Sequence, residues 1–330
     1  MNRSQNFSER IISNDLSFTS IAAWFGARIG LTVLGSILNF SILLLVYVNK
    51  RLRAGSGILI AHLVACDFVS CFVHVPINTA MPLAHALGYN LPREMCTYVY
   101  CAYTVTFVAG TWTESCLGLN RFVAVCFPQH YRYFAAKKIT HGMILFCWVI
   151  GLSVQVPTAF GVTGSFAMSN GHCHTKIDVV SSYGVFALAV STYVPYTIIG
   201  SSCGIILLQT TFLKFYRKRK IQPRSVMGEE RLPKTVGIIP SERRMAVARM
   251  LIASFVWYFL WNSPAPILTS RWPKVMAIQS VNWWMRVTLV VRMAFNPVIF
   301  YAMGSDYREA LTALLGMLAA RHGQIFSRTK

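Results

Sequence analysis

Seven apolar segments constrain the fold of this chain more than any other feature of its sequence. A transmembrane helix needs about 20 apolar residues. Lipid offers no hydrogen-bond partner to a backbone group, so segments that cross it must be helical. We therefore predict an all-α membrane protein, built as a seven-transmembrane helix bundle. The segments cover approximately residues 22–49, 57–86, 94–127, 139–160, 181–213, 244–270 and 277–303.

The ends of the chain differ from these segments. Residues 1–21 are polar and lack the apolar core of a cleavable signal peptide, so we expect the first helix to direct insertion. They form the predicted extracellular N-terminus, and the bundle spans 22–303. Residues 304–330 begin with an amphipathic stretch from Ser305 to about Leu318, which predicts a short eighth helix before a cytosolic tail.

The net charge of +20 could suggest a nucleic-acid-binding protein. However, the basic residues lie between apolar segments and form no face of a soluble domain, and only 13% of residues are charged, against about 25% in soluble proteins. We therefore exclude nucleic acid as a partner. The basic residues instead predict the orientation, because basic loops remain in the cytosol. They follow the first, third, fifth and seventh segments.

This pattern places the N-terminus outside and the C-terminus in the cytosol of a plasma-membrane protein. Two glycosylation sequons begin at Asn2 and Asn6, on the predicted outer side. Of nine cysteines, only Cys96 and Cys173 lie at loop-like positions, also outside, where one disulfide is possible. The polar, basic loop 214–243 could bind anionic lipid or dock a cytosolic partner.

Each segment also carries a distinctive residue, and their order and spacing resemble the rhodopsin-like (class A) G-protein-coupled receptors. Cys96 precedes Arg121 by 25 residues, which is the spacing found in that family. The resemblance covers nearly the whole chain. The residues that carry it are Asn39, Leu63, Asp67, Pro76, Cys96, Asn120-Arg121-Phe122, Pro128, Trp148, Pro157, Cys173, Pro195, Pro264, Asn296-Pro297 and Tyr307-Arg308.

The resemblance implies a cell-surface receptor that binds an extracellular ligand and activates a heterotrimeric G protein, with arrestin as a further partner. It also implies a disulfide between Cys96 and Cys173, and a sodium ion at Asp67 that favours the resting state. It implies a G-protein-facing switch, whose residues in this chain are Asn120, Arg121, Phe122, Arg244, Asn296, Pro297 and Phe300.

Several switch residues depart from the family pattern. Asn120 replaces the usual acid before Arg121, and Phe122 replaces the usual tyrosine. Arg244 stands where the sixth helix often supplies a second acid. Cys203 and Phe300 replace two tyrosines that usually move toward the arginine. We therefore expect a weaker restraint on the inactive state, with basal activity.

The buried polar core also departs from the family. Arg292 occupies a position that usually holds a small polar residue, and Glu114 lies on the third segment. An arginine at this depth must be paired. Our hypothesis is that Arg292 pairs with Asp67, shared with Glu114, and replaces the sodium ion; the alternative is that it extends to water. With Asn39, these residues form the predicted polar core.

Six residues are candidates for the ligand pocket: His74, Tyr103, Thr104, Phe107, Asn262 and Arg286. Arg286 could bind a ligand carboxylate or phosphate, or pair with Glu94 or Asp178. Phe107 and His74 could equally serve helix packing. Trp283 and Trp284 lie near the predicted rim of the pocket, or form an interfacial belt. The short outer loops suit a small molecule, lipid or short peptide.

Two other classes compete with a receptor. A transporter is the alternative, but the chain shows neither an inverted repeat nor paired broken helices. An enzyme is disfavoured, because no nucleophile motif or His/Glu metal spacing occurs. No cofactor is expected, since the last segment lacks a lysine for a retinal Schiff base.

Overall fold

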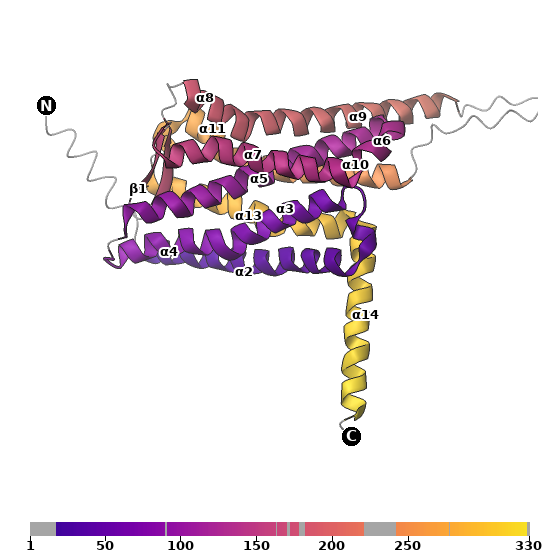
Figure 1. The fold of residues 1–330 in the computed structure, drawn as a ribbon, viewed down its shortest axis with the longest axis horizontal. Coiled ribbons are helices and arrows are strands. Elements are labelled where there is room, and N and C mark those ends of the chain that lie inside the picture. Colours follow the sequence, from indigo (N-terminus) through magenta and orange to yellow (C-terminus); the bar gives the residue numbers. More distant parts are fainter. Residues whose placement is uncertain are drawn as a thin grey trace, which may run out of the picture.

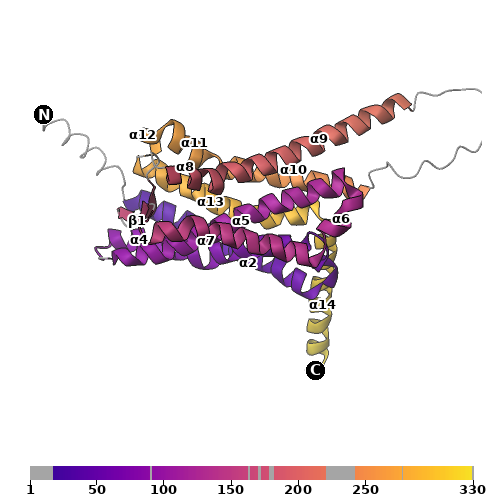
Figure 2. The same cartoon turned by 45° about the horizontal axis from the view of Figure 1, so that its top comes forward.

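The computed structural model describes residues 18–89, 91–162, 164–169, 172–177, 182–220, 242–276 and 278–328. Within these ranges the chain forms a bundle of long helices that run side by side, with one short hairpin at one end (Figures 1 and 2). The predicted sequons at Asn2 and Asn6 and residues 221–241 of the basic loop lie outside the described residues.

The bundle follows the apolar segments of the sequence, so the all-α prediction is confirmed. Short connecting elements are η1 (Lys50–Arg53), α6 (Pro128–Phe134) and α12 (Pro273–Met276). The bundle helices are α2 (Phe18–Val48), α3 (Gly57–Val69) with α4 (Val75–Ala86), α5 (Arg93–Cys126), α7 (Lys137–Ala159), α8 (Ser182–Leu188) with α9 (Val194–Lys220), α10 (Glu242–Asn262) with α11 (Pro264–Arg271), and α13 (Gln279–Met303).

Five helical stretches in the described chain are long and apolar enough to cross a membrane, judged by length and composition. α5, and α10 together with α11, correspond to the other two of the seven predicted transmembrane segments. α5 is the central helix, packed against α3, α7, α9 and α10, and this enclosure lets it carry polar residues that a lipid-facing helix would exclude. The five stretches are Thr19–Val48, Gly57–His85, Lys137–Ala159, Tyr183–Gln209 and Ser280–Met303.

Three predicted helix boundaries were wrong. α9 continues to Lys220, beyond the expected residue 213, because its basic last turns are good helix formers although they are not apolar. The segment 244–270 is interrupted at Ser263, since Pro264 cannot donate a backbone hydrogen bond. The eighth helix, α14 (Ser305–Arg328), extends past Leu318, where Ala319, Ala320 and Arg321 are good helix formers. It points away from the bundle in Figure 1.

Two bundle helices contain a π-helical turn just before a proline. η2 (Ser70–His74) precedes Pro76, and η3 (Ala189–Tyr193) precedes Pro195. A proline removes one backbone donor and its ring displaces the preceding turn, and a wider turn accommodates both effects. A π-helical turn rotates the side chains within it relative to a regular α-helix, and His74 is one of these side chains.

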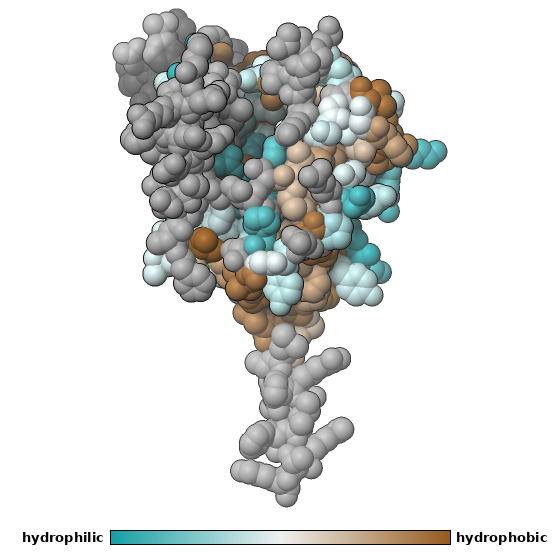
Figure 3. All heavy atoms as spheres, turned by 90° about the vertical axis from the view of Figure 1, so that its left-hand side faces the viewer, coloured by the Kyte–Doolittle hydropathy of each residue, from teal (hydrophilic) through white to brown (hydrophobic). Residues whose placement is uncertain are grey.

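A β-hairpin covers the end of the bundle at which α2 begins. Strands β1 (Gly164–Ser169) and β2 (His172–Ile177) pair antiparallel. A disulfide joins Cys173 in β2 to Cys96 at the start of α5, so the pairing that the resemblance implied is present. Figure 3 views this hairpin end, where hydrophilic and hydrophobic side chains alternate over the surface. The opposite end, beside α6, is called the α6 end below.

The first and last bundle helices approach closely. A Cβ atom at Gly35 would lie 2.9 Å from Ala294, so only glycine permits this contact. Asn39, one turn further along α2, donates hydrogen bonds to the carbonyls of Gly35 (2.8 Å) and Met293 (3.0 Å). Asn39 thus holds α2 against α13 beside the polar core.

Candidate functional site

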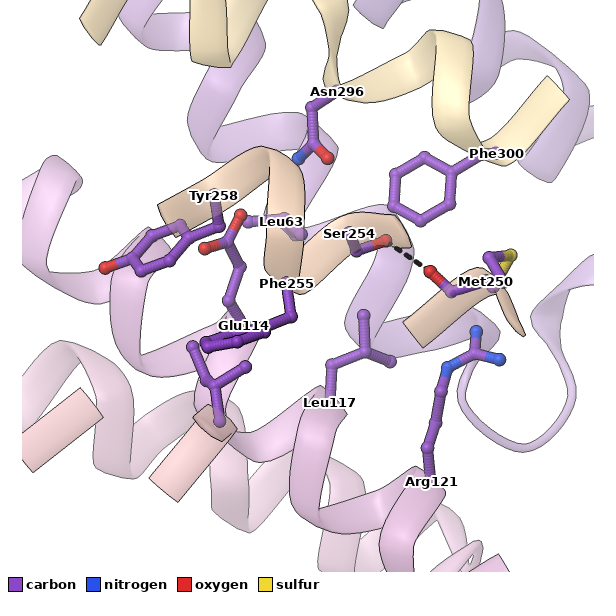
Figure 4. Close-up of a pocket in the computed structure, with 11 residues that line it drawn as sticks. Leu63, Glu114, Leu117, Arg121, Met250, Ser254, Phe255, Tyr258, Asn296 and Phe300 are labelled. Carbon is purple, nitrogen blue, oxygen red and sulfur yellow. Dashed lines mark hydrogen bonds between the residues drawn. The ribbon is translucent and has the colours of Figure 1, made fainter. Parts of the chain in front are cut away.

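Arg121 lies in an internal pocket between α5, α10 and α13. Figure 4 shows Arg121 and Leu117 extending from α5 toward Met250 of α10 and Phe300 of α13. The guanidinium is buried, and the described residues contain no ion pair to it. The pocket is lined by Leu63, Glu114, Leu117, Arg121, Ile199, Met250, Ser254, Phe255, Tyr258, Asn296 and Phe300. Mostly apolar walls therefore surround the arginine.

The neighbours of Arg121 give it little polar restraint. Asn120 is fully buried, and within the described chain neither its oxygen nor its nitrogen has a hydrogen-bond partner. Phe122 packs beside a buried apolar cluster that includes Cys203. Phe300 packs against the ring of Tyr307, at 6.0 Å between centroids. The backbone of Arg244 lies in α10, but its side chain is outside the described residues.

A buried ionic cluster lies deeper in the bundle. Arg292 of α13 donates through Nη1 to Oε1 of Glu114 at 3.1 Å, and its Nη2 lies 3.7 Å from Oδ1 of Asp67. The Arg292 side chain is 1% exposed, so the alternative that it extends to water is wrong. The cluster joins α3, α5 and α13, the helices whose inner surfaces form the centre of the bundle.

Aromatic and amide groups complete this cluster. The Arg292 guanidinium lies over the rings of Phe107 and Tyr258, at 5.3 and 5.4 Å from their centroids. Asn296 donates to Oδ2 of Asp67 at 2.9 Å. Charge pairing, hydrogen bonds and cation–π contacts together compensate the loss of water around the guanidinium. Phe107 therefore faces the ionic cluster and does not serve only apolar packing.

These contacts do not fit a sodium ion at Asp67. One carboxylate oxygen of Asp67 accepts a hydrogen bond from Asn296, and the other faces the Arg292 guanidinium. A sodium ion needs several oxygen ligands, and a cation as close as this guanidinium repels it. The described part of the chain also contains no group of three or more His, Cys, Asp or Glu side chains that could hold a metal ion.

Three of the six candidate ligand residues lie together. His74, Tyr103 and Phe107 lie together, with ring centroids 6.1 Å apart between Tyr103 and each of the others. His74 Nε2 also lies 3.4 Å from Thr106 Oγ1. In contrast, Thr104 donates its hydroxyl to backbone carbonyls of its own helix, and Asn262 is buried where α10 ends. His74, Tyr103 and Phe107 thus form a contiguous row of packed rings.

Arg286 is held by groups other than those expected from the sequence. Its Nε donates to Oδ1 of Asn282 at 2.9 Å, and its Nη1 donates to the carbonyl of Cys173 at 3.1 Å. Glu94 is exposed and forms no ion pair with Arg286, so that proposed pairing is wrong. Asp178 lies outside the described residues. Arg286 therefore ties α13 to the disulfide-linked hairpin.

The sequence placed Trp283 near the rim of the ligand pocket, but Trp24 and His172, which pack against it beside Arg286, were missed. Trp24 donates through Nε1 to the carbonyl of Trp283 at 3.0 Å, and His172 packs against both indole rings. Trp283 is 4% exposed, so its assignment to an interfacial belt is wrong, whereas Trp284 is exposed. The signal available in the sequence was Arg28, a charge within the first apolar segment, which is a functional-site indicator by itself.

The chain is similar to known membrane receptors. The family described as "7 transmembrane receptor (rhodopsin family)" matches residues 38–300. Endothelin receptor type B from Homo sapiens is 30% identical over 129 residues, which are 39% of this chain and 29% of that receptor. Prokineticin receptor 1 from Homo sapiens is 24% identical over 159 residues, which are 46% of this chain and 40% of that receptor.

Octopamine receptor 2 from Lymnaea stagnalis is 26% identical over 174 residues, which are 52% of this chain and 28% of that receptor. The chain therefore spans less than half of the length of each of these relatives. The names of these receptors refer to three different ligands, so the likeness alone selects none of them.

Proposed function

Because the chain belongs to the rhodopsin family of seven-transmembrane receptors, we propose that it is a plasma-membrane receptor that activates a heterotrimeric G protein when an extracellular ligand binds. The pocket around Arg121 is the observation that carries this proposal. Apolar side chains surround this buried arginine at the α6 end, and no ion pair to it occurs in the described part of the chain. It is available to a partner once α10 moves away from α5.

The proposal assigns an orientation to the bundle. The hairpin end, with the N-terminus and the sequons at Asn2 and Asn6, faces the outside. The α6 end, α14 and the tail face the cytosol, where the G protein and arrestin bind. The basic inner loops support this orientation, because positive residues remain in the cytosol. A transporter is not favoured, since the relatives are receptors.

The switch in this proposal consists of Arg121 and the residues around its pocket. Asn120 and Phe122 leave Arg121 without an adjacent acid, so the inactive state is held weakly. Asn296 links the switch to the ionic cluster through its bond to Asp67. Pro297, inside α13, permits the helix to bend there. The complete set is Asn120, Arg121, Phe122, Arg244, Asn296, Pro297 and Phe300.

Basal GDP–GTP exchange tests the proposal without a known ligand. Purified receptor in nanodiscs should accelerate exchange on at least one member of a panel of purified G proteins. Arg121→Ala removes the positive charge that Arg121 offers to the G protein. It should lower that exchange about tenfold or more, which corresponds to a loss of about 1.4 kcal/mol or more of interaction free energy.

Arg271→Ala provides the matched control, because Arg271 is an exposed arginine at the end of α11, remote from the pocket. It should keep the exchange rate of the unmodified receptor. If no G protein in the panel responds, or if both variants lose activity equally, the proposed coupling through Arg121 is wrong.

A further inference from the structure

An arginine near the hairpin end is buried without an acidic partner. Arg28, in α2, is 5% exposed, and its guanidinium lies 4.9 Å from the centroid of the Trp24 ring. Its Nε is buried without a hydrogen-bond partner, and no ion pair to it exists among the described residues. Burying an unpaired charge is costly, so this side chain needs a partner that the described chain does not supply.

A second cation faces the same place. Arg286 donates to the carbonyl of Cys173, which directly follows His172 in β2. The pKa of His172 is lowered to about 2, first by burial and then by Arg286 and Arg28. Both guanidinium groups therefore lie close enough to act on the same imidazole. His172 remains neutral, and its Nε2 has no partner among the described residues.

The two arginines are surrounded by aromatic rings. The rings of Trp24 and Trp283 lie 4.6 Å apart, with His172 against both of them. Tyr100 and Tyr103, whose ring centroids lie 5.8 Å apart, are close enough to Arg28 to interact with it electrostatically. The hairpin that carries His172 is fixed by the disulfide, so this arrangement is rigid at one side. The region combines apolar walls with positive charge that no acid of the described residues pairs.

We propose that Arg28 and Arg286 form a subsite for an anionic ligand, in which a carboxylate or phosphate group is attached to an aromatic or apolar body. The anion supplies the negative charge that the described chain lacks, and guanidinium groups bind such oxyanions with directed hydrogen bonds. The apolar body lies against the indole and phenol rings. This inference rests on the proposed receptor function and assigns the chemical class of its ligand.

Thermal stability measures occupancy of this subsite without a known natural ligand. The full chain is purified in nanodiscs of neutral phosphatidylcholine, at constant ionic strength. Phenylacetate and phenyl phosphate are the anionic probes, and phenylacetamide is the neutral match. At concentrations on the order of 10 mM, at least one anion should raise Tm by about 2–4 °C, and the amide should not. The better anion distinguishes carboxylate from phosphate ligands.

Variants show whether the two arginines are responsible. Arg28→Gln and Arg286→Gln should each lose most of the anion-dependent rise in Tm, whereas Arg271→Gln, at an exposed position outside the cluster, should keep it. Without a probe, Arg28→Gln should be at least as stable as the unmodified protein, because it removes a buried, unpaired charge. A fall in its Tm would instead show that Arg28 serves packing against Trp24, and would overturn the proposal.

Three further results overturn the anion subsite: no rise in Tm with either anion, an equal rise with phenylacetamide, or a rise that survives in both Gln variants. These measurements contain no G protein. An anion effect with no GDP–GTP exchange on any G protein would therefore contradict the proposed function alone. Exchange without an anion effect would contradict only the subsite.

Discussion

Replacing Arg292 by serine should destabilise the protein by roughly 3–5 kcal/mol, because it leaves two carboxylates buried without their shared cation. Arg292 contacts both Glu114 and Asp67 in the centre of the bundle. For a bundle of this size, the loss corresponds to a fall in Tm of about 10 °C, measured in choline chloride so that no small cation can substitute.

The same variant should become responsive to sodium. Serine is the kind of small polar residue that leaves room for an ion between the two carboxylates, so sodium chloride should recover part of the lost Tm, and choline chloride should not. Adding Glu114→Gln to Arg292→Ser should reduce the destabilisation, because one uncompensated charge is removed. Arg271→Ser is the control for a lost exposed arginine and should remain near the unmodified Tm.

Exposed ion pairs contribute about 1 kcal/mol or less to stability. If Arg292→Ser lowers the free energy of unfolding by no more than that, Arg292 does not act as the shared cation of the two carboxylates. Such a result would mean that the bundle relaxes to hydrate the carboxylates, and that Arg292 is not required to neutralise them.

Replacing Asn120 by aspartate should lower basal GDP–GTP exchange about tenfold. Among the described residues, the buried Asn120 amide has no hydrogen-bond partner and Arg121 beside it forms no ion pair. A carboxylate at this position can pair with Arg121 and stabilise the inactive arrangement by about 1.4 kcal/mol, which is a factor of ten in the equilibrium between the two states.

Asn120→Ala separates the effect of the charge from the loss of the amide. It should keep basal exchange near that of the unmodified receptor, since it creates no acid and removes a group that bonds to nothing in the described chain. If Asn120→Asp and Asn120→Ala give equal exchange rates, the missing acid does not set the level of basal exchange.

The helices could be predicted from the sequence because hydropathy and length are local properties. α2, α7 and α13 lie within a few residues of their predicted segments. The boundaries failed where the sequence stays helical but stops being apolar, as in the last turns of α9 and α14. Hydropathy measures partition into lipid, whereas helix propensity decides where such turns end.

The buried ionic cluster could also be anticipated, because charges at membrane depth must find each other. The residues around Arg28 could not. Trp24 and Trp283 are 259 positions apart, and only the packing of α2 on α13 brings them together. His172 reaches them through the hairpin and its disulfide. Arg28 gave a signal as a lone charge, but its surroundings depend on long-range contacts that no local pattern contains.

The cation dependence of the unmodified receptor tests the central claim, that Arg292 takes the place of the sodium ion in the buried core. Basal GDP–GTP exchange and Tm should be measured in sodium, lithium and choline chloride at equal ionic strength. We predict the same exchange rate and the same Tm in all three salts, because Asp67 is already occupied by Arg292 and Asn296. A selective loss of exchange or gain in Tm with sodium would contradict it.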